Sequence, residues 1–198
     1  MVTWQRLGSV TLGSSADTMD LTITAKKYLK VLIHTLKDGT VDNTSFRFGT
    51  GSGVDTGNNY TWNRGKDGSN HSQANYNYLR IPFGNYASYS ETTIINVANK
   101  AKICHIECCS VENTGADNAP TWVETSGVWH NTSAQITEVK CWQSGGGSFA
   151  TGTTMTILGA EDDVLGYNYP NLTNGTIFEE SDTGKHYMFD GTSTWNEM

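Results

Sequence analysis

The chain has 198 residues, a net charge of −7 at pH 7, and only 17% charged residues. This acidic balance argues against a nucleic-acid-binding protein and against a protein that docks on an anionic membrane, because both need a basic surface. The length suits one β domain, which can bury a core without disulfides or metals.

Neither a membrane span nor a secretory signal is expected in this sequence. No apolar run approaches the length that crosses a bilayer. The first seven residues, MVTWQRL, lack the basic region and the apolar stretch of a signal peptide. We therefore expect that the protein folds in a cytosol and has no membrane partner.

Short runs of alternating apolar and polar residues recur along the chain, separated by clusters of Gly, Asn, Asp, Ser and Thr. This pattern is typical of an all-β sandwich or barrel. Helix is expected to be minor, with at most one turn at 98–102. In chain order, strands are expected at 4–12, 21–24, 27–35, 46–48, 60–64, 76–81, 92–97, 102–110, 121–125, 128–129, 135–142 and 153–159.

The spacing of the expected strands and turns predicts a jelly-roll-like antiparallel β-sandwich over residues 1–161, a linker over 162–170, and a small C-terminal β-hairpin over 171–198. A hairpin of this size is marginal alone in water. Its apolar residues therefore need either the sandwich or a neighbouring subunit to cover them. These apolar residues are Ile177, Phe178, Tyr187, Phe189 and Trp195.

Residues 49–77 form a long stretch rich in Gly and Asn. A stretch of this length in a compact domain is usually functional or part of an interface. Its Tyr and Trp residues suit contact with a protein or stacking on a sugar ring, because each combines a large apolar area with a polar group. Packing at the ends of the sandwich is a third explanation. The aromatic residues in the polar segments are Tyr60, Trp62, Tyr76, Tyr78, Tyr86 and Tyr89.

The cysteines are expected to be free, buried and apolar, because disulfides are rare in a cytosolic product. On a strand, the even and odd positions of 104–109 face opposite sides, so neither side presents a Cys/His set at zinc spacing. No metal site is therefore predicted. A disulfide from Cys141 to Cys104 or Cys108 stays open for a protein that later meets an oxidising medium.

No catalytic set is recognisable in the sequence. The histidines are scattered, and no Gly-x-Ser-x-Gly elbow is present. Asp- and Asn-rich segments could hold calcium, but none has the EF-hand spacing, and turn formation explains them more simply. The sequence thus predicts a protein that is not an enzyme and that needs no cofactor.

Several sequence blocks point to a known family. They are Trp4-x-x-Leu7-Gly8, 27–34, Phe46-Arg47-Phe48, 127–137, 149–153 and 157–160. Together they resemble a β-sandwich domain that recurs in structural proteins of tailed phages, especially marine ones. Residues 174–195 look like a small β motif that is common near the ends of phage fibre and virion proteins.

This resemblance implies a virion component, either a capsid decoration or a head- or tail-fibre protein, that is assembled in the host cytoplasm. It implies no catalytic residues. We expect a symmetric homo-oligomer, with a trimer as the preferred form, that also contacts other virion proteins such as the major capsid protein. The predicted interface or ligand-binding residues are Tyr60, Trp62, Arg64, Tyr187, Phe189 and Trp195.

The alternative function is a receptor- or glycan-binding module displayed on the particle, with a host surface glycan as its ligand. This alternative predicts a shallow groove lined by two or three parallel aromatic faces, with Asn, Asp or Arg beside them. The two functions are compatible, because a displayed structural block can also bind cells.

Overall fold

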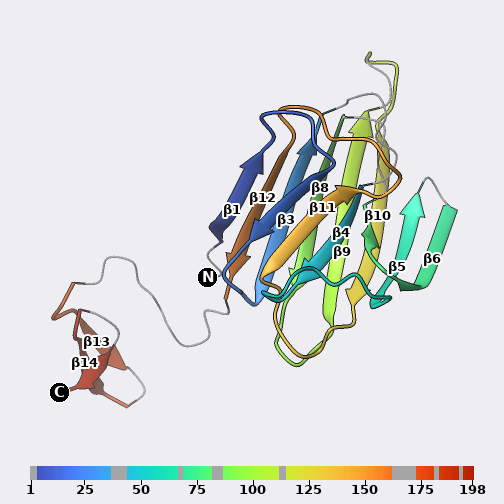
Figure 1. Cartoon of the computed structure of the whole chain (residues 1–198). Coiled ribbons are helices and arrows are strands. Elements are labelled where there is room, and N and C mark those ends of the chain that lie inside the picture. The colour runs from blue at the N-terminus through green and yellow to red at the C-terminus, as the bar shows by residue number, and fades with distance from the viewer. Residues whose placement is uncertain are drawn as a thin grey trace. The chain divides into compact units, whose positions relative to one another are not determined.

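The computed structural model describes residues 4–36, 44–66, 69–81, 87–111, 115–161, 173–180, 183–191 and 194–198. Residues Thr3–Glu161 form one compact unit, and the C-terminal part of the chain from Asp162 belongs to another. The regular elements in the described residues are all β-strands (Figure 1), which confirms the all-β prediction. No helix in these residues is long and apolar enough to cross a membrane.

The first unit contains an eight-stranded sheet and a four-stranded sheet, both antiparallel. In spatial order, the larger sheet consists of β1 (Gln5–Thr11), β12 (Thr154–Ala160), β3 (Tyr28–Thr35), β8 (Ala87–Ile95), β9 (Lys102–Val111), β10 (Thr121–Trp129), β5 (Tyr60–Lys66) and β6 (Ser69–Tyr76). The smaller sheet consists of β2 (Thr18–Thr22), β11 (Glu138–Gln143), β4 (Thr44–Gly49) and β7 (Leu79–Arg80).

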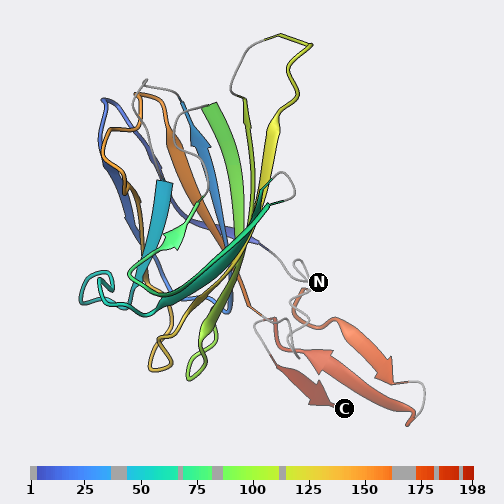
Figure 2. The same cartoon turned by 90° about the vertical axis from the view of Figure 1, so that its right-hand side faces the viewer.

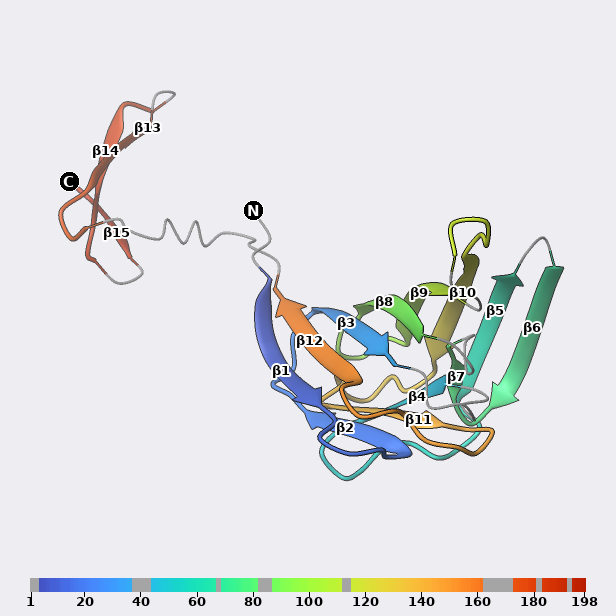
Figure 3. The same ribbon diagram turned by 90° about the horizontal axis from the view of Figure 1, so that it is seen from above.

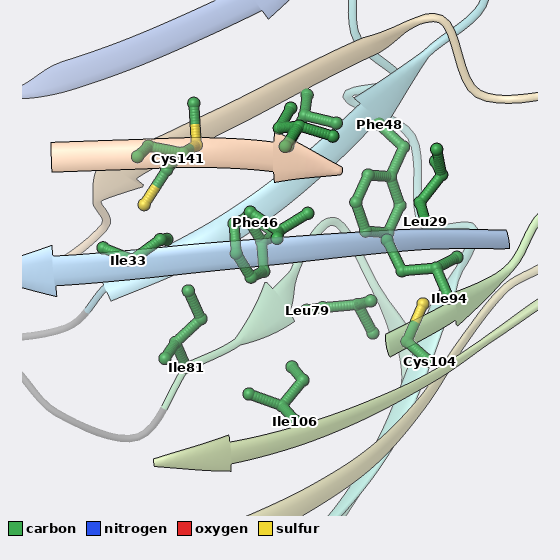
Figure 4. Close-up of a cluster of buried hydrophobic side chains, with 14 of the residues drawn as sticks. Leu29, Ile33, Phe46, Phe48, Leu79, Ile81, Ile94, Cys104, Ile106 and Cys141 are labelled. Atoms are coloured by element: carbon green, nitrogen blue, oxygen red, sulfur yellow. The ribbon is translucent and has the colours of Figure 1, made fainter. Parts of the chain in front are cut away.

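The two sheets form the layers of a sandwich (Figure 3) and share one hydrophobic core. On β3, Leu29, Val31 and Ile33 are buried, whereas the residues between them are more exposed. This alternation places one side of each strand in the core. Figure 4 shows the meeting of the layers, with Phe46 and Phe48 of the smaller sheet among side chains of the larger one.

The order of the strands is compatible with the jelly-roll detail, which stays a prediction. Strands β1, β3, β8 and β12 lie together in one sheet, and β2, β4, β7 and β11, which come between them along the chain, lie in the other. A jelly roll is built from two such four-stranded sheets. The remaining strands, β5, β6, β9 and β10, widen the larger sheet beyond β8.

Strand β6 was not predicted, because its sequence SNHSQANY has no alternation of apolar and polar residues. Its pairing with β5, from Lys66↔Ser69 to Tyr60↔Tyr76, makes it a strand. Its register shifts between Tyr60 and Trp62, where β6 contains one residue more than β5.

The second unit is a three-stranded antiparallel sheet of β13 (Ile177–Glu180), β14 (Lys185–Phe189) and β15 (Trp195–Glu197), seen in Figure 2. The sequence predicted only a hairpin here. The third strand forms because residues from Trp195 to Glu197 pair with β14. The predicted linker at 162–170 lies outside the described residues.

Candidate interaction surfaces

Tyr60, a predicted contact residue, is a core residue. Its ring is fully buried and stacks on Trp129, with the centroids 6.2 Å apart and the planes 14° apart. Its hydroxyl accepts a hydrogen bond from the Phe48 backbone N–H at 3.0 Å and donates one to the Asp55 carbonyl at 3.2 Å. Burial raises the pKa of this hydroxyl well above its usual value. In this fold the side chain of Tyr60 is not available to a partner.

Trp62 and Arg64 follow on the same side of β5. Trp62 is also buried, and its indole N–H has no hydrogen-bond partner among the described residues. Arg64 is half-buried, and burial together with the nearby Arg80 guanidinium lowers the pKa of Arg64. The predicted contact role therefore does not fit Tyr60 or Trp62, whereas part of Arg64 reaches the surface.

A chain of aromatic rings runs from Trp62 to the smaller sheet. Trp62 meets Tyr76 at 6.2 Å and 89°, Tyr76 meets Tyr78 at 4.6 Å and 79°, and Tyr78 meets Trp142 at 5.3 Å and 90°. The Arg47 guanidinium lies over the Trp142 ring, 4.4 Å from its centroid. Successive rings meet edge to face, a packing arrangement typical of protein interiors. They therefore join β5, β6, the residue just before β7, and β11, and they do not present parallel faces.

The outer face of the larger sheet carries exposed apolar residues, of which only Tyr89 was among the aromatic residues noted in the sequence. Ile103, which is 55% exposed, lies beside Ile95 on β8 and Val128 on β10. Trp122, 53% exposed, forms another row with Cys109 and Tyr89. Outward positions along β9 alternate with core positions. This alternation is visible in the sequence, but the pairing that assembles the rows is not.

Between these two apolar rows lies a row of three glutamates. Glu107 on β9 pairs in register with Glu91 on β8 and with Glu124 on β10. The His105 Nε2 atom lies 3.5 Å from the Glu107 carboxylate and 3.4 Å from that of Glu124. At the β8 end of the row, Lys30 forms an ion pair with Glu91. The outer face therefore combines exposed apolar area with negative charge.

A shallow depression of about 320 Å³ lies on the β5 side of this face. Polar side chains of β5, β6 and β10 surround the apolar side chains of Ile103 and Val128. No exposed aromatic ring lines it, since Trp62 is buried in the core. The lining residues are Thr61, Trp62, Asn63, Gln73, Ile103, Ser126, Gly127 and Val128.

The C-terminal sheet brings together the other three predicted contact residues. Tyr187 and Phe189 on β14 lie on the same face as Trp195 on β15 and Phe178 on β13, as the register requires. Phe189 is 5.2 Å from Trp195, and Phe178 is 6.0 Å from Trp195 and 6.5 Å from Tyr187, measured between ring centroids. We call these four residues the aromatic face. The opposite face carries Ile177 and Met188.

The aromatic face is only partly covered. Phe178 is 52% exposed, and the other three rings are half-buried. Charged residues border it, since Lys185 pairs with Glu197 at 3.0 Å beside Tyr187. Three short strands provide no second layer of their own, so the rings can be shielded only by each other or by another surface.

The three buried cysteine thiols are unsuited to nucleophilic chemistry at neutral pH. All four are free, and three of them are buried. Burial raises the pKa of Cys108 to about 12 and raises those of Cys104 and Cys141 further. The thiolate is the reactive form. Within the part of the chain that the structure describes, no group of three or more His, Cys, Asp or Glu side chains is arranged to hold a metal ion.

Comparison with known proteins does not assign the chain to a family. A scan against protein-family models finds no match. A search of the curated proteins finds no significant similarity.

Proposed function

We propose that this chain is a structural protein of a tailed-phage particle, and that it packs against neighbouring subunits through the aromatic face of its C-terminal sheet. One observation carries the proposal. Phe178, Tyr187, Phe189 and Trp195 gather on one side of a sheet that has only three short strands, and Phe178 is half exposed. Burying such a face against another protein would stabilise both the sheet and the assembly.

The sandwich supports this proposal as a rigid building block. Its core is continuous across both sheets, and the described connections are held by backbone hydrogen bonds such as Ile23 to Thr137 and Ile81 to Thr44. The apolar rows on the outer face of the larger sheet offer a second contact area. We infer that the neighbours are further copies of this chain and other virion proteins, including the major capsid protein.

The alternative, a glycan-binding module, finds less support. Sugar rings stack on exposed aromatic faces, but the rings of Tyr76, Tyr78 and Trp142 meet each other at 79° and 90°. The depression on the outer face has no exposed ring. A glycan array probed with the full chain distinguishes the two functions, because binding to a defined sugar would favour the alternative.

The substitution Phe178→Ser tests the aromatic face. Its matched control is Ile177→Ser, because Ile177 lies next to it on the opposite face and is 57% exposed. Particles are assembled with each chain, purified, and analysed by mass spectrometry for the amount incorporated. We expect the wild type and Ile177→Ser to be incorporated equally and Phe178→Ser to be largely lost. Absence of the wild-type chain from purified particles, or full incorporation of Phe178→Ser, would contradict the proposal.

A further inference from the structure

Strand β6 is the last strand of the larger sheet in Figure 3. Among the described residues it pairs with β5 alone, so one of its sides has no partner strand there. Every residue of β6 is exposed except Tyr76, which is half-buried. The backbone N–H and C=O groups along the outer side of the strand can therefore receive another strand.

Along Ser69–Gln73 this edge lacks the features with which proteins usually prevent such pairing. Charged residues, proline, bulges and very short length all protect edges. None of the eight residues of β6 is Asp, Glu, Lys, Arg or Pro. From Ser69 to Gln73 each residue also pairs one-to-one with β5, so the irregularity comes only after this run.

The other edges among the described strands are protected. Strand β1 contains the charged residue Arg6, and β2 contains Asp20, which pairs with Lys140. Strand β7 has only two residues. In the C-terminal sheet, β13 contains two glutamates, and β15 has only three residues. The contrast singles out β6 as the edge that is open to pairing.

We propose that β6 pairs antiparallel with β6 of a second copy of this chain, which joins the two larger sheets across a two-fold axis. The partner strand must have a free edge of its own. No charged side chains should face each other across the contact. A second β6 meets both conditions in every register, because it brings only Ser, Asn, His, Gln, Ala and Tyr. Self-complementary two-fold contacts are also the commonest in homo-oligomers.

This contact closes at two copies and so differs from the trimer that we expect from the sequence. The inference goes beyond the proposed function and does not rest on it, because β6 belongs to the sandwich and the aromatic face belongs to the C-terminal sheet. Loss of one contact need not affect the other.

The test uses the full chain with Ser72→Lys and, separately, Ser72→Glu. When Ser69–Gln73 of one copy pairs antiparallel with the same residues of the other copy, residue 72 of each copy faces residue 70 of the other. The two copies of residue 72 then lie diagonally opposite each other, within reach of long side chains. Sedimentation over a wide range of concentrations should show a dimer for the wild type. Each variant alone should raise the dimer dissociation constant about tenfold or more, and an equal mixture of the two should restore the dimer.

The matched control is Ser9→Lys, an exposed serine on the opposite edge strand β1. It should leave the dimer unchanged. A wild type that is monomeric throughout, a dimer that survives Ser72→Lys, or a mixture that stays monomeric would each overturn the proposal. Open-ended filaments that both Ser72→Lys and Ser9→Lys abolish would also overturn it, since they would show pairing between β6 and β1.

Hydrogen–deuterium exchange gives a second measurement that requires no variant. The amides of 69–73 should exchange more slowly as the concentration of the wild-type chain rises, whereas those of β1 should not change. Exchange of 69–73 that is independent of concentration would overturn the proposal. Slowing only after another protein is added would have the same consequence, because β6 would then pair with a foreign strand.

Discussion

The indole N–H of Trp129 donates a hydrogen bond to the Asp55 carboxylate at 2.7 Å. The same carboxylate accepts hydrogen bonds from the Asn59 side chain at 2.9 Å and from the Gly57 backbone N–H at 2.8 Å. Trp129 ends β10, and Asp55 lies in the segment between β4 and β5. One carboxylate therefore ties this Gly- and Asn-rich segment to the core.

Replacing Asp55 by Ala should destabilise the sandwich by about 1–3 kcal/mol, because the buried indole N–H and two further donors lose a charged acceptor. Chemical denaturation followed by Trp fluorescence measures this loss. The exposed Asp117→Ala is the control and should have little effect. An Asp55→Ala variant as stable as the wild type would show that the hydrogen bonds contribute nothing net.

The stabilisation by Asp55 should also depend on pH. Burial alone would raise the pKa of Asp55, but the hydrogen bonds from Trp129, Asn59 and Gly57 outweigh it and hold the pKa below its ordinary value of 3.8. The contribution is therefore complete above that value and disappears as the pH falls through the lowered pKa. The difference in stability between wild type and Asp55→Ala should thus shrink in acid, and a difference that grows would contradict this account.

Gly127 lies in β10 where β7 approaches the larger sheet. A Cβ atom there would come within 2.6 Å of the Leu79 side chain, which is fully buried. Gly127→Ala should therefore destabilise the fold by about 1–3 kcal/mol through overpacking. Gly13→Ala is the control, because a Cβ there meets nothing within 4 Å. Thermal unfolding of both variants measures this difference, and we expect a lower melting temperature for Gly127→Ala. Equal melting temperatures would show that Leu79 moves without cost.

Removing the middle charge of the glutamate row should stabilise the sandwich. Glu107 faces a like charge on each neighbouring strand, and such pairs are unfavourable. Glu107→Gln should gain about 0.2–1 kcal/mol in the free energy of unfolding. Glu91→Gln should not show this gain, because it removes the partner of Lys30. If Glu107→Gln is destabilising, then the contact with His105 outweighs the repulsion.

One thiol should react with an alkylating reagent in the folded protein. Cys109 is exposed on the outer face, whereas Cys104, Cys108 and Cys141 are buried with raised pKa values. Mass spectrometry after brief treatment should find a single modified cysteine, and Cys109→Ser should abolish the reaction. Unfolding in denaturant should expose all four. Modification of Cys141 in the native protein would contradict the buried placement.

The strands with clear alternation could be predicted from the sequence, because burial of one side leaves a two-residue period. The expected strand at 27–35 corresponds to Tyr28–Thr35, and that at 102–110 to Lys102–Val111. Strand β6 could not be found in this way, since neither of its sides is buried. The pairing of β15 with β14 also left no signal, because three residues are too few to show a period.

The predicted contact residues fall into two groups. For one group the local sequence pattern shows which side chains lie together, and for the other it does not. Tyr187, Phe189 and Trp195 do gather on one face, because alternation within a short sheet is enough to align them. An aromatic residue in a polar segment predicts an interface at Tyr60, yet its ring stacks on Trp129, which is 69 residues away in the chain. No local pattern shows which distant ring will cover an aromatic residue.

The three glutamates side by side on the outer face should make the stability of the larger sheet depend on ionic strength. Dissolved ions weaken repulsion between exposed carboxylates, and they also weaken the self-repulsion of a chain with a net charge of −7. Raising the ionic strength should therefore stabilise this sheet. In nearly pure water the repulsion within this row should be at its strongest.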